Sequence, residues 1–295
     1  MTVRIDAHQH FWLLARGDYG WLTPALGSIY RDFMPEELRV LLDACGIDAT
    51  VAVQAAPTVA ETKFLLSLAA EHAWIAGVVG WVDLEAPDAA QVIASLARAN
   101  PKLVGLRPMI QDIPEPRWML QDNLAPALAA MEQYNLTFDA LVVPEHLPAL
   151  SAFLRRYPTL RVVIDHGAKP QIRDDAFEPW AQQMRDIAQR FSGVYCKLSG
   201  LATEARPDQA KSAKDLQPYA AHLLEVFGPE RLIFGSDWPV MQGATDYRSW
   251  FDAVAGYASG LSPAQKAAIM GGNAARAYPR LILATSEEPK DSLTP

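Results

Sequence analysis

Short runs of β-branched and other apolar residues alternate along this chain with alanine- and leucine-rich stretches, and this alternation constrains the fold more than any other feature. The runs have the length of buried strands, and the stretches between them carry helix signals. Eight strands, joined by helical crossovers, predict an α/β fold, a (β/α)₈ TIM barrel, rather than an open sheet. The predicted strands are 4–10, 50–54, 77–83, 103–107, 137–143, 161–166, 194–199 and 232–237.

Three of the intervening stretches begin or end with clear helix signals. Pro35 starts a predicted helix with one apolar face, and Gly46 ends it. Thr58 with Glu61 has the pattern of a capping box. Ser262-Pro263 with Gln265 starts a further helix after the eighth strand. These signals place helices between strands, as the barrel requires.

The chain is expected to form one domain. Its 295 residues are normal for a single barrel of this kind, and half of them are hydrophobic, which is enough for a large core. No composition shift divides the sequence and no repeat is visible. We therefore expect a single-domain barrel over 1–284 and a polar C-terminal tail over 285–295.

Charge and cysteine content limit the partners and the compartment. A net charge of −8 disfavours a nucleic-acid partner. Cys45 and Cys196 lie inside apolar runs, which favours buried free thiols and a reducing cytoplasm over a disulfide. No signal core precedes the first strand and no run is long enough to cross a membrane. We expect a cytoplasmic protein without membrane contact, and the sequence leaves a homo-oligomer open.

Polar residues end nearly every predicted strand, where barrel enzymes build their sites. Burying so many ionisable groups without a reason would cost several kcal/mol each, to order of magnitude. Their convergence at one mouth of the barrel explains them together. The residues are His8, His10, Trp81, Asp83, Arg107, Asp139, Asp165, His166, Lys197 and Asp237.

Two histidines and an aspartate at opposite ends of the chain have the spacing of a metal or proton-transfer site. His8 and His10 are two residues apart on a strand and so face one side. Asp237 ends the eighth strand, which adjoins the first in a closed barrel, and His166 adds a third imidazole. Neutral imidazoles with one carboxylate suit zinc with an open position for water. The alternatives are a hydrogen-bonded core pair of histidines and an Asp237 that only caps a turn.

Other residues are candidates for substrate binding. Three segments that follow strands are unusually long, 11–34, 108–122 and 200–215, and the first brings aromatic residues, including Trp12, that suit a sugar-sized ligand. Arg107 and Lys197 either orient a substrate or form structural ion pairs, Arg107 with Asp83 or Asp139. His146 either reaches the rim or starts a helix, whereas His72 and His222 are expected at the surface without a role. The candidates are Trp12, Trp81, Arg107, Asp139, His146, Lys169 and Lys197.

Several longer segments together resemble the amidohydrolase superfamily, and specifically the amidohydrolase-2 group of sugar lactonases. The resemblance covers about residues 4 to 283. It rests on 5–12 (IDAHQHFW), 165–170 (DHGAKP), 196–201 (CKLSGL), 234–239 (FGSDWP) and 272–276 (GNAAR). It implies a TIM barrel, L-fuconolactone- or L-rhamnono-lactone-type substrates and a place in sugar metabolism such as L-fucose catabolism. It also implies metal or proton-transfer roles for His8, His10, His166 and Asp237.

One departure from that group bears on the metal. Many superfamily members place a lysine or glutamate on the fourth strand to bridge two metals, whereas this strand ends in Arg107. A cation cannot ligate a second metal, so a binuclear centre is not expected. The fifth strand offers Asp139 rather than the usual histidine. The resemblance therefore implies one Zn²⁺, which catalysis need not require, or none.

These observations predict a carboxylic ester hydrolase that opens a sugar-acid lactone to the aldonic acid. Asp237 would take a proton from the attacking water, and His166, nearby cations or the metal would stabilise the oxyanion. The alternatives are a zinc-dependent decarboxylase of the same superfamily, a lactonase for muconolactone or pyrone carboxylates, and a sugar-binding barrel without catalysis.

Overall fold

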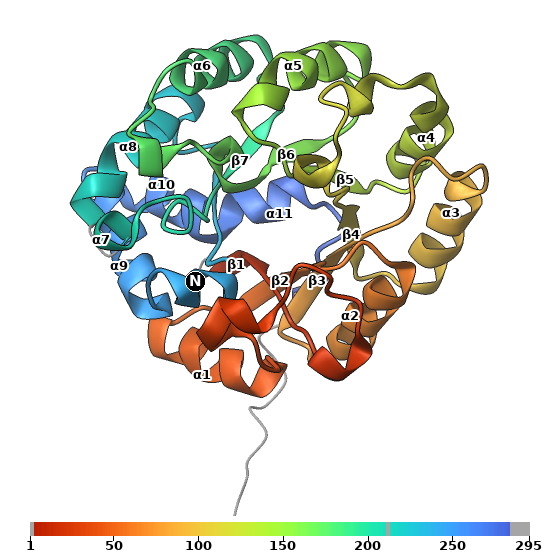
Figure 1. Cartoon of the computed structure of the whole chain (residues 1–295), viewed down its shortest axis with the longest axis horizontal. Helices are drawn as coiled ribbons and strands as arrows, with labels where there is room; N and C mark the ends of the chain where they lie inside the picture. Colours follow the sequence, from red (N-terminus) through yellow and green to blue (C-terminus); the bar gives the residue numbers. More distant parts are fainter. Residues whose placement is uncertain (1–2, 211–212, 284–295) are drawn as a thin grey trace, which may run out of the picture.

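The strands form the predicted barrel in the computed structural model, which describes residues 3–283 except 211–212 (Figure 1). All neighbouring strands pair in parallel and in sequence order, from β1 to β8. A bridge between Gln9 and Trp238 brings the end of β1 beside the segment that follows β8. The strands are Ile5–Gln9 (β1), Ala49–Val53 (β2), Ile75–Gly80 (β3), Leu103–Leu106 (β4), Thr137–Ala140 (β5), Val162–Ile164 (β6), Tyr195–Leu198 (β7) and Leu232–Phe234 (β8).

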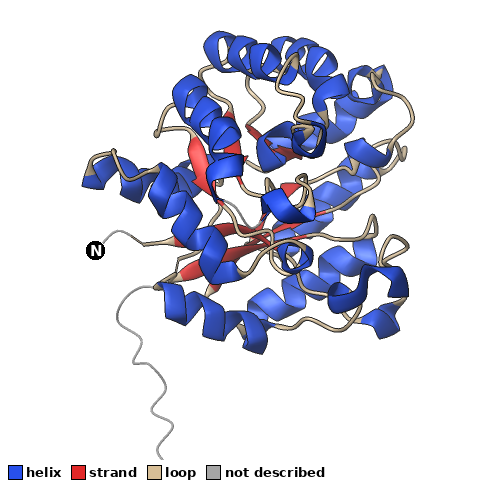
Figure 2. Cartoon of the chain, turned by 60° about the vertical axis from the view of Figure 1, so that its left-hand side comes forward, coloured by secondary structure: helices blue, strands red, loops and turns tan. Residues whose placement is uncertain are grey.

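Helices surround the strands, and Figure 2 shows the strands enclosed between them. In the part of the chain that the structure describes, one α-helix follows each of the first six strands, two follow β7, and three follow β8. The helices are Pro35–Cys45 (α1), Val59–Glu71 (α2), Ala89–Ala99 (α3), Ala125–Gln133 (α4), Leu147–Arg156 (α5), Trp180–Arg190 (α6), Pro207–Ala210 (α7), Ala213–Phe227 (α8), Tyr247–Tyr257 (α9), Pro263–Ala267 (α10) and Asn273–Ala277 (α11).

The predicted helix signals are confirmed, with one difference at α2. Gly46 ends α1 in the left-handed conformation, and Ser262 and Gln265 form a reciprocal capping box at α10. Thr58 caps α2 by accepting the backbone N–H of Glu61. The Glu61 carboxylate does not return to Thr58. It instead accepts the N–H groups of Ala55 and Ala56 and so holds the loop after β2.

The apolar residues form two buried clusters. One lies between strands and helices, and the other includes Val51, Val53 and Val79 from the strands. Tyr278, which follows α11, belongs to the second cluster and contacts β5 through a hydrogen bond to Asp139. The Thr137 hydroxyl, at the start of β5, donates to the carbonyl of Ala277 in α11, so α11 packs at the end of the barrel opposite the strand ends that carry the histidines.

Other expectations have mixed outcomes. Cys45 and Cys196 are buried and free, as predicted. The expected surface position of His222 is wrong: the ring is 4% exposed and bonds to the carbonyl of Ala181. Within the described part of the chain, none of the helices has the length and apolarity to cross a bilayer. The predicted polar tail over 285–295 lies outside the described residues.

Candidate active site

His8 lies in β1 and His10 directly follows that strand, and both lie beside Asp237, which follows β8. Beyond the last residues of β8, the Asp237 N–H donates to the carbonyl of His8 over 2.8 Å. The His10 N–H in turn donates to the carbonyl of Trp238 over 2.7 Å. Asp237 has a φ of 62°, which is uncommon for a residue with a side chain. The same backbone bonds that continue the sheet thus fix the carboxylate beside the imidazoles.

A strained turn after β6 supplies the third imidazole. His166, Ala168 and Lys169 all have positive φ angles, between 50° and 60°. Such conformations cost energy and occur where the surrounding structure enforces them. The Nδ1 atom of His166 bonds to the Ser199 hydroxyl over 2.8 Å. Gly200 allows this contact, because a Cβ there would lie 2.5 Å from that nitrogen.

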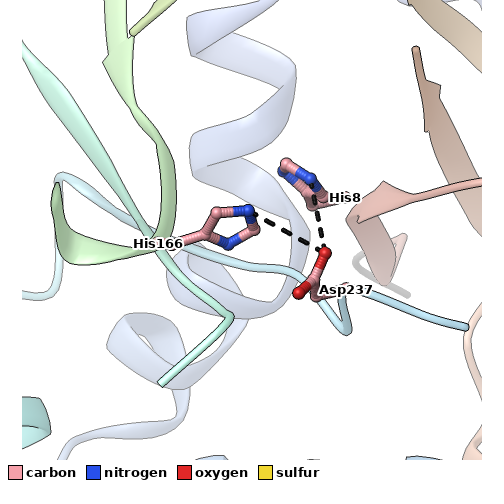
Figure 3. A group of neighbouring side chains, drawn as sticks. All are labelled: His8, His166 and Asp237. Carbon is pink, nitrogen blue, oxygen red and sulfur yellow. Dashed lines mark ion pairs between the residues drawn. The ribbon is translucent and has the colours of Figure 1, made fainter. Parts of the chain in front are cut away.

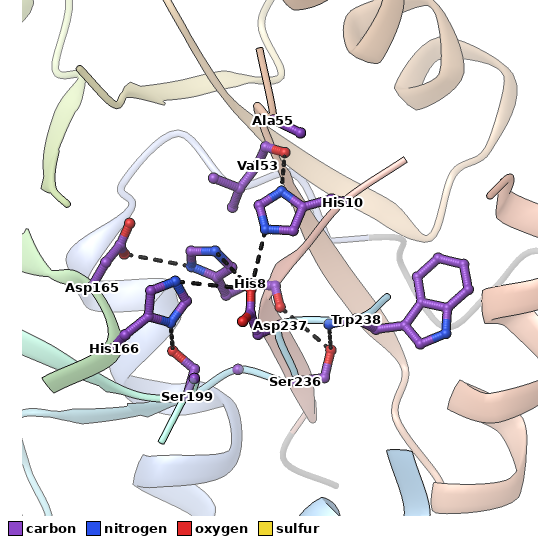
Figure 4. Close-up of polar contacts among 12 residues, drawn as sticks. His8, His10, Val53, Ala55, Asp165, His166, Ser199, Ser236, Asp237 and Trp238 are labelled. Carbon is purple, nitrogen blue, oxygen red and sulfur yellow. Dashed lines mark hydrogen bonds and ion pairs between the residues drawn. The ribbon is translucent and has the colours of Figure 1, made fainter. Parts of the chain in front are cut away.

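The Nε2 atoms of the three histidines converge on one oxygen of Asp237 (Figures 3 and 4). The distances to Oδ1 are 3.2 Å from His10, 3.7 Å from His8 and 3.8 Å from His166. The Nδ1 atom of His10 lies 2.8 Å from the carbonyl oxygen of Val53, to which it must donate. Its Nε2 atom therefore presents a lone pair to Asp237, unless the imidazole and the carboxylate share a proton. The arrangement is suited to accepting and returning one proton.

Burial and neighbouring charges keep the Asp237 carboxylate ionised and the His8 and His166 imidazoles neutral. Burial alone would raise the pKa of Asp237, but His166, His10 and His8 outweigh it and lower that pKa below its usual range. Burial lowers the pKa of His166 to about 4. Burial and the charge of Lys197 lower the pKa of His8 well below its usual value. At neutral pH the group holds a carboxylate base next to uncharged His8 and His166 rings.

A second set of ionisable groups lies deeper in the barrel, and we call it the buried charge layer: Lys197, Asp139, Asp165 and Tyr278. All four side chains are fully buried. Lys197 Nζ lies 2.6 Å from Asp139 and 2.9 Å from Asp165. The Tyr278 hydroxyl donates to Asp139 over 2.8 Å. Burial raises the pKa of Asp139 to about 6, whereas Lys197 and His8 overcome burial and lower the pKa of Asp165.

His8 and Arg107 connect this layer to the histidines. His8 Nδ1 lies 3.2 Å from Lys197 Nζ and 3.5 Å from Asp165 Oδ1. Arg107 Nη1 lies 3.4 Å from both His8 Nε2 and Asp165 Oδ2. Its other Nη donates to the backbone carbonyl of Gln54. The predicted ion pair of Arg107 with Asp83 or Asp139 is replaced by one with Asp165.

A cavity of about 330 Å³ opens above these groups. Loops after seven of the eight strands contribute to its lining, and the backbone carbonyl of Ala55 fixes the Trp21 ring by accepting its indole N–H over 2.7 Å. The lining combines apolar side chains with charged ones, which suits a polyhydroxylated ring. The lining residues are His10, Trp21, Ala55, Arg107, Met109, Gln111, Asp112, Leu141, His166, Lys169, Thr203, Glu204, Asp237 and Val240.

The structure brings most of the predicted site residues together, but at two depths. His10, Arg107, His166, Lys169 and Asp237 line the cavity. A second group is fully buried beneath them and does not line it: His8, Asp139 and Lys197.

Four residues named from the sequence lie away from the cavity. Trp12 is buried, and its indole N–H donates to the carbonyl of Arg31. Trp81 is held through its backbone by Thr62 and does not line the cavity. His146 Nδ1 accepts the Val143 N–H at the start of a helical turn. Asp83 is exposed, accepts the N–H of Glu85 and does not line the cavity.

Sequence reasoning missed several lining residues. Trp21, Gln111 and Glu204 lie in the three long segments that the sequence singled out, but the periodic pattern says nothing about how a loop folds. The length of these segments indicated that they contribute to the site, but no sequence feature indicated which of their residues do. Gln54 was also missed, and its place at the end of β2 was the available signal.

His8, His166 and Asp237 form a donor set that fits one metal ion. Each offers one ligand atom, and the three atoms lie within 4.8 Å of one another. Two neutral imidazoles and an ionised carboxylate match the ligands of catalytic zinc, which keeps an open position for water. The Nε2 atoms of His8 and His166 lie 3.7 and 3.8 Å from Asp237 Oδ1, so the three groups face one another.

The comparisons with known proteins agree with this geometry. Residues 5–280 match the amidohydrolase family. An L-fucono-1,5-lactonase of Burkholderia ambifaria is 47% identical, with 94% of this chain and 96% of that protein aligned. The L-fucono-1,5-lactonase of Burkholderia multivorans is 40% identical over the same shares of the two chains.

Solved structures agree as well. A crystal structure of an amidohydrolase from Burkholderia multivorans with bound zinc superposes with a TM-score of 0.87. It is 38% identical, and the superposition covers 94% of this chain and 99% of that one. The match over nearly the whole barrel, and the identity of the curated relatives, show that this chain belongs to the amidohydrolase family.

Proposed function

We propose that this chain is a lactonase that hydrolyses a sugar-acid lactone of the L-fuconolactone type to the aldonic acid. The observation that carries the proposal is the convergence of three imidazole Nε2 atoms on one Asp237 oxygen at the cavity. The names of relatives at 47% and 40% identity support the substrate class. A general base, donors that can stabilise an oxyanion and a sugar-sized cavity lie together at this site.

Asp237 acts as the general base. Its carboxylate takes a proton from water as the water oxygen bonds to the lactone carbonyl carbon. The electron pair of the carbonyl moves to its oxygen, which becomes the oxyanion. Arg107 reaches the cavity with a guanidinium held by Asp165 and Gln54, and it stabilises this charge. The Nε2–H of His166, when its Nδ1 accepts from Ser199, is a second donor.

Ring opening then returns the proton. The oxyanion reforms the carbonyl, the bond between the carbonyl carbon and the ring oxygen breaks, and Asp237 protonates the departing oxygen. His10 stays within 3.2 Å of the same carboxylate oxygen and can hold the proton between the two steps. The product is a carboxylic acid and a hydroxyl group. The acid loses its proton to the solvent, which is the acid release that an indicator detects, and the protein retains no net proton.

Zinc, where bound, would be held by His8, His166 and Asp237. Its chemistry is to polarise a carbonyl or lower the pKa of a bound water. We propose a single ion, because Arg107 occupies the strand-four position at which a second metal would need a ligand. An activated ester needs less assistance than an amide, so the side chains retain activity without the metal.

The cavity also matches a sugar lactone in shape and polarity. The Trp21 ring lies at the mouth and is 37% exposed, as a stacking platform for a sugar ring would be. Met109, Leu141 and Val240 supply an apolar wall that a 6-deoxy methyl group can contact. Gln111 and Glu204 offer hydrogen-bonding groups to hydroxyls.

The test is a pH-indicator assay with L-fucono-1,5-lactone and a panel of 1,4- and 1,5-aldonolactones, corrected for spontaneous opening. Acid release above the spontaneous rate, largest with L-fuconolactone, is the expected result. The assay is repeated after chelation with verified metal removal and after zinc is restored. Activity that survives removal, with a loss of about tenfold or less, is expected if the side chains suffice.

Three other outcomes would change the proposal. No turnover on any aldonolactone would overturn it and direct attention to aromatic and dicarboxylic lactones. Release of carbon dioxide from an acid substrate would support a decarboxylase instead. Activity that vanishes on chelation and returns with zinc would make the metal on His8, His166 and Asp237 essential and contradict the metal-independent route.

A further inference from the structure

Four polar side chains from three different loops form a hydrogen-bonded row across the cavity, and we call it the rim row: Glu204, Lys169, Gln111 and Asp112. Lys169 Nζ lies 3.1 Å from the Glu204 carboxylate and donates to Gln111 Oε1 over 2.9 Å. Gln111 Nε2 in turn donates to Asp112 over 3.4 Å. All four line the cavity that also contains Asp237. The row therefore lies where a substrate's ring substituents must pass or bind.

The rim row pairs the positive charge of Lys169 with a carboxylate inside the cavity. Arg107 and Lys169 are the arginine and lysine side chains among the described lining residues. Arg107 is paired with Asp165 and Lys169 with Glu204. Against these two cations the lining holds three carboxylates, Asp112, Glu204 and Asp237. A second carboxylate on a substrate would meet repulsion and no unpaired cation.

Neutral hydroxyl groups meet a different surface. A hydroxyl both donates and accepts, so it can bond to a carboxylate oxygen, to a lysine N–H or to either end of an amide. Lys169 and Glu204 are each about one fifth exposed and so keep atoms accessible to such a group. The row can exchange partners with ring hydroxyls without leaving a buried charge unpaired.

We propose that Glu204, by pairing with Lys169, makes the cavity select neutral polyhydroxylated lactones and reject lactones with a second carboxylate. This inference rests on the proposed lactonase function and deepens it. Selection arises from repulsion built into the site as much as from attraction to the preferred substrate. Removing the Glu204 charge should expose Lys169 as a carboxylate-binding group.

The test compares two lactones that differ in one group. L-galactono-1,4-lactone has a terminal hydroxymethyl group, and galactaro-1,4-lactone of the same ring configuration has a carboxylate in its place. The wild-type protein should prefer the neutral lactone in kcat/KM by about tenfold or more. The E204Q variant should gain about tenfold in kcat/KM on the carboxylated lactone and bind galactarate more tightly in competition assays.

Matched variants distinguish the effect of the Lys169–Glu204 pair from the effect of the net charge of the cavity. D112N changes the net charge of the cavity by the same amount but leaves the Lys169–Glu204 pair intact, so its gain should be threefold or less, on the order of general screening effects. The double variant E204Q/K169Q should lose the gain of E204Q. An equal gain in D112N, or a gain that survives in the double variant, would overturn the proposal.

The two proposals can fail separately. Wild-type protein that opens neutral lactones, together with an E204Q variant that gains nothing on the carboxylated one, would refute only the role of Glu204. Wild-type protein that opens neither lactone, nor L-fuconolactone, would refute the proposed function. K169Q supplies an independent check, because removing the cation should keep or strengthen the preference for the neutral lactone.

Discussion

The barrel holds two sets of ionisable groups, and they differ in how their charges are balanced. Beneath the cavity, the buried charge layer pairs Lys197 with two carboxylates at 2.6 and 2.9 Å. At the cavity, the ion-pair contacts of Asp237 within the described residues are with three imidazoles, at 3.2 to 3.8 Å. The deeper set has short cation–carboxylate contacts, whereas the upper set is poised to move a proton.

This difference separates stability from catalysis. The carboxylates of the buried charge layer lie beneath the cavity and do not line it, so they cannot take a proton from a water bound there. Asp237 lines the cavity. The histidines beside it lower its pKa, and their own protons can shift during a reaction. We therefore expect substitutions in the upper set to reduce turnover, and substitutions in the buried charge layer to reduce the free energy of unfolding.

The largest expected effect is that of Asp237→Asn on turnover. The amide fills the same volume but cannot accept the proton from water, so kcat for L-fuconolactone should fall between about a hundredfold and ten-thousandfold. The unfolding midpoint in denaturant should change little. Asp252→Asn, which alters an exposed carboxylate paired with Arg248, is the matched control and should leave kcat unchanged. Near-normal turnover in the Asp237 variant would show that another group is the base.

The barrel and the strand-end residues were predictable for a physical reason. Buried parallel strands are short apolar runs, and residues at i and i+2 of a strand face one side. That logic placed His8 and His10 together and brought Asp237 from the far end of the chain beside them. It depends only on strand order and periodicity, which the sequence displays.

The rim was not predictable by the same logic. Trp21, Gln111 and Glu204 reach the cavity through loops whose paths depend on tertiary contacts, such as the bond from Trp21 to the Ala55 carbonyl. His146 shows the opposite case, since its side chain accepts the backbone N–H of Val143, three residues earlier, at the start of a helical turn. Side chains that satisfy nearby backbone groups cannot be told from ligand-binding ones without coordinates.

Lys197→Met should give the largest loss of stability. The methionine matches the volume but leaves Asp139 and Asp165 buried without their shared cation, and breaking a buried ion pair costs about 3–5 kcal/mol. Denaturant unfolding measures the loss. The control is Lys102→Met, because Lys102 contacts only backbone carbonyls in the described structure and its loss should cost about 1.5–3 kcal/mol.

A second variant tests the cause of that loss. Asp139→Asn together with Lys197→Met removes one of the stranded charges and should recover part of the stability. A Lys197→Met protein as stable as the wild type but with greatly reduced turnover would contradict the proposed division, because it would assign the lysine to the upper set through its contact with His8.

Glu61 offers a buried carboxylate bound by backbone N–H groups rather than by a cation. Burial raises its pKa from 4.5 to about 7, although the N–H groups of Ala55 and Ala56 oppose the change. A folded-state pKa above the unfolded one adds stability below pH 4.5, and this stability is lost as pH rises through about 7. The loss should amount to at most about 3 kcal/mol.

Glu61→Gln isolates this contribution. The free energy of unfolding of the wild type, measured at pH 4.5 and at pH 8, should fall more with rising pH than that of the variant, by up to the same amount. Asp165 should behave oppositely, because its pKa is lowered and its contribution is lost as pH falls. Equal pH dependence in wild type and variant would mean that the N–H groups fully stabilise the Glu61 charge.

Tyr278→Phe should have the smallest effect and gives the sharpest view of the boundary between the two sets. It removes one hydroxyl that donates to Asp139, and a hydrogen bond to a charged group contributes about 1.5–3 kcal/mol. We expect the lower value, because Lys197 still contacts the same carboxylate oxygen. Tyr30→Phe, at an exposed position, should cost almost nothing. If Tyr278→Phe lowers kcat markedly while the free energy of unfolding changes little, the electrostatic effect of Asp139 is transmitted to His8 through Lys197. The two sets then act as one network.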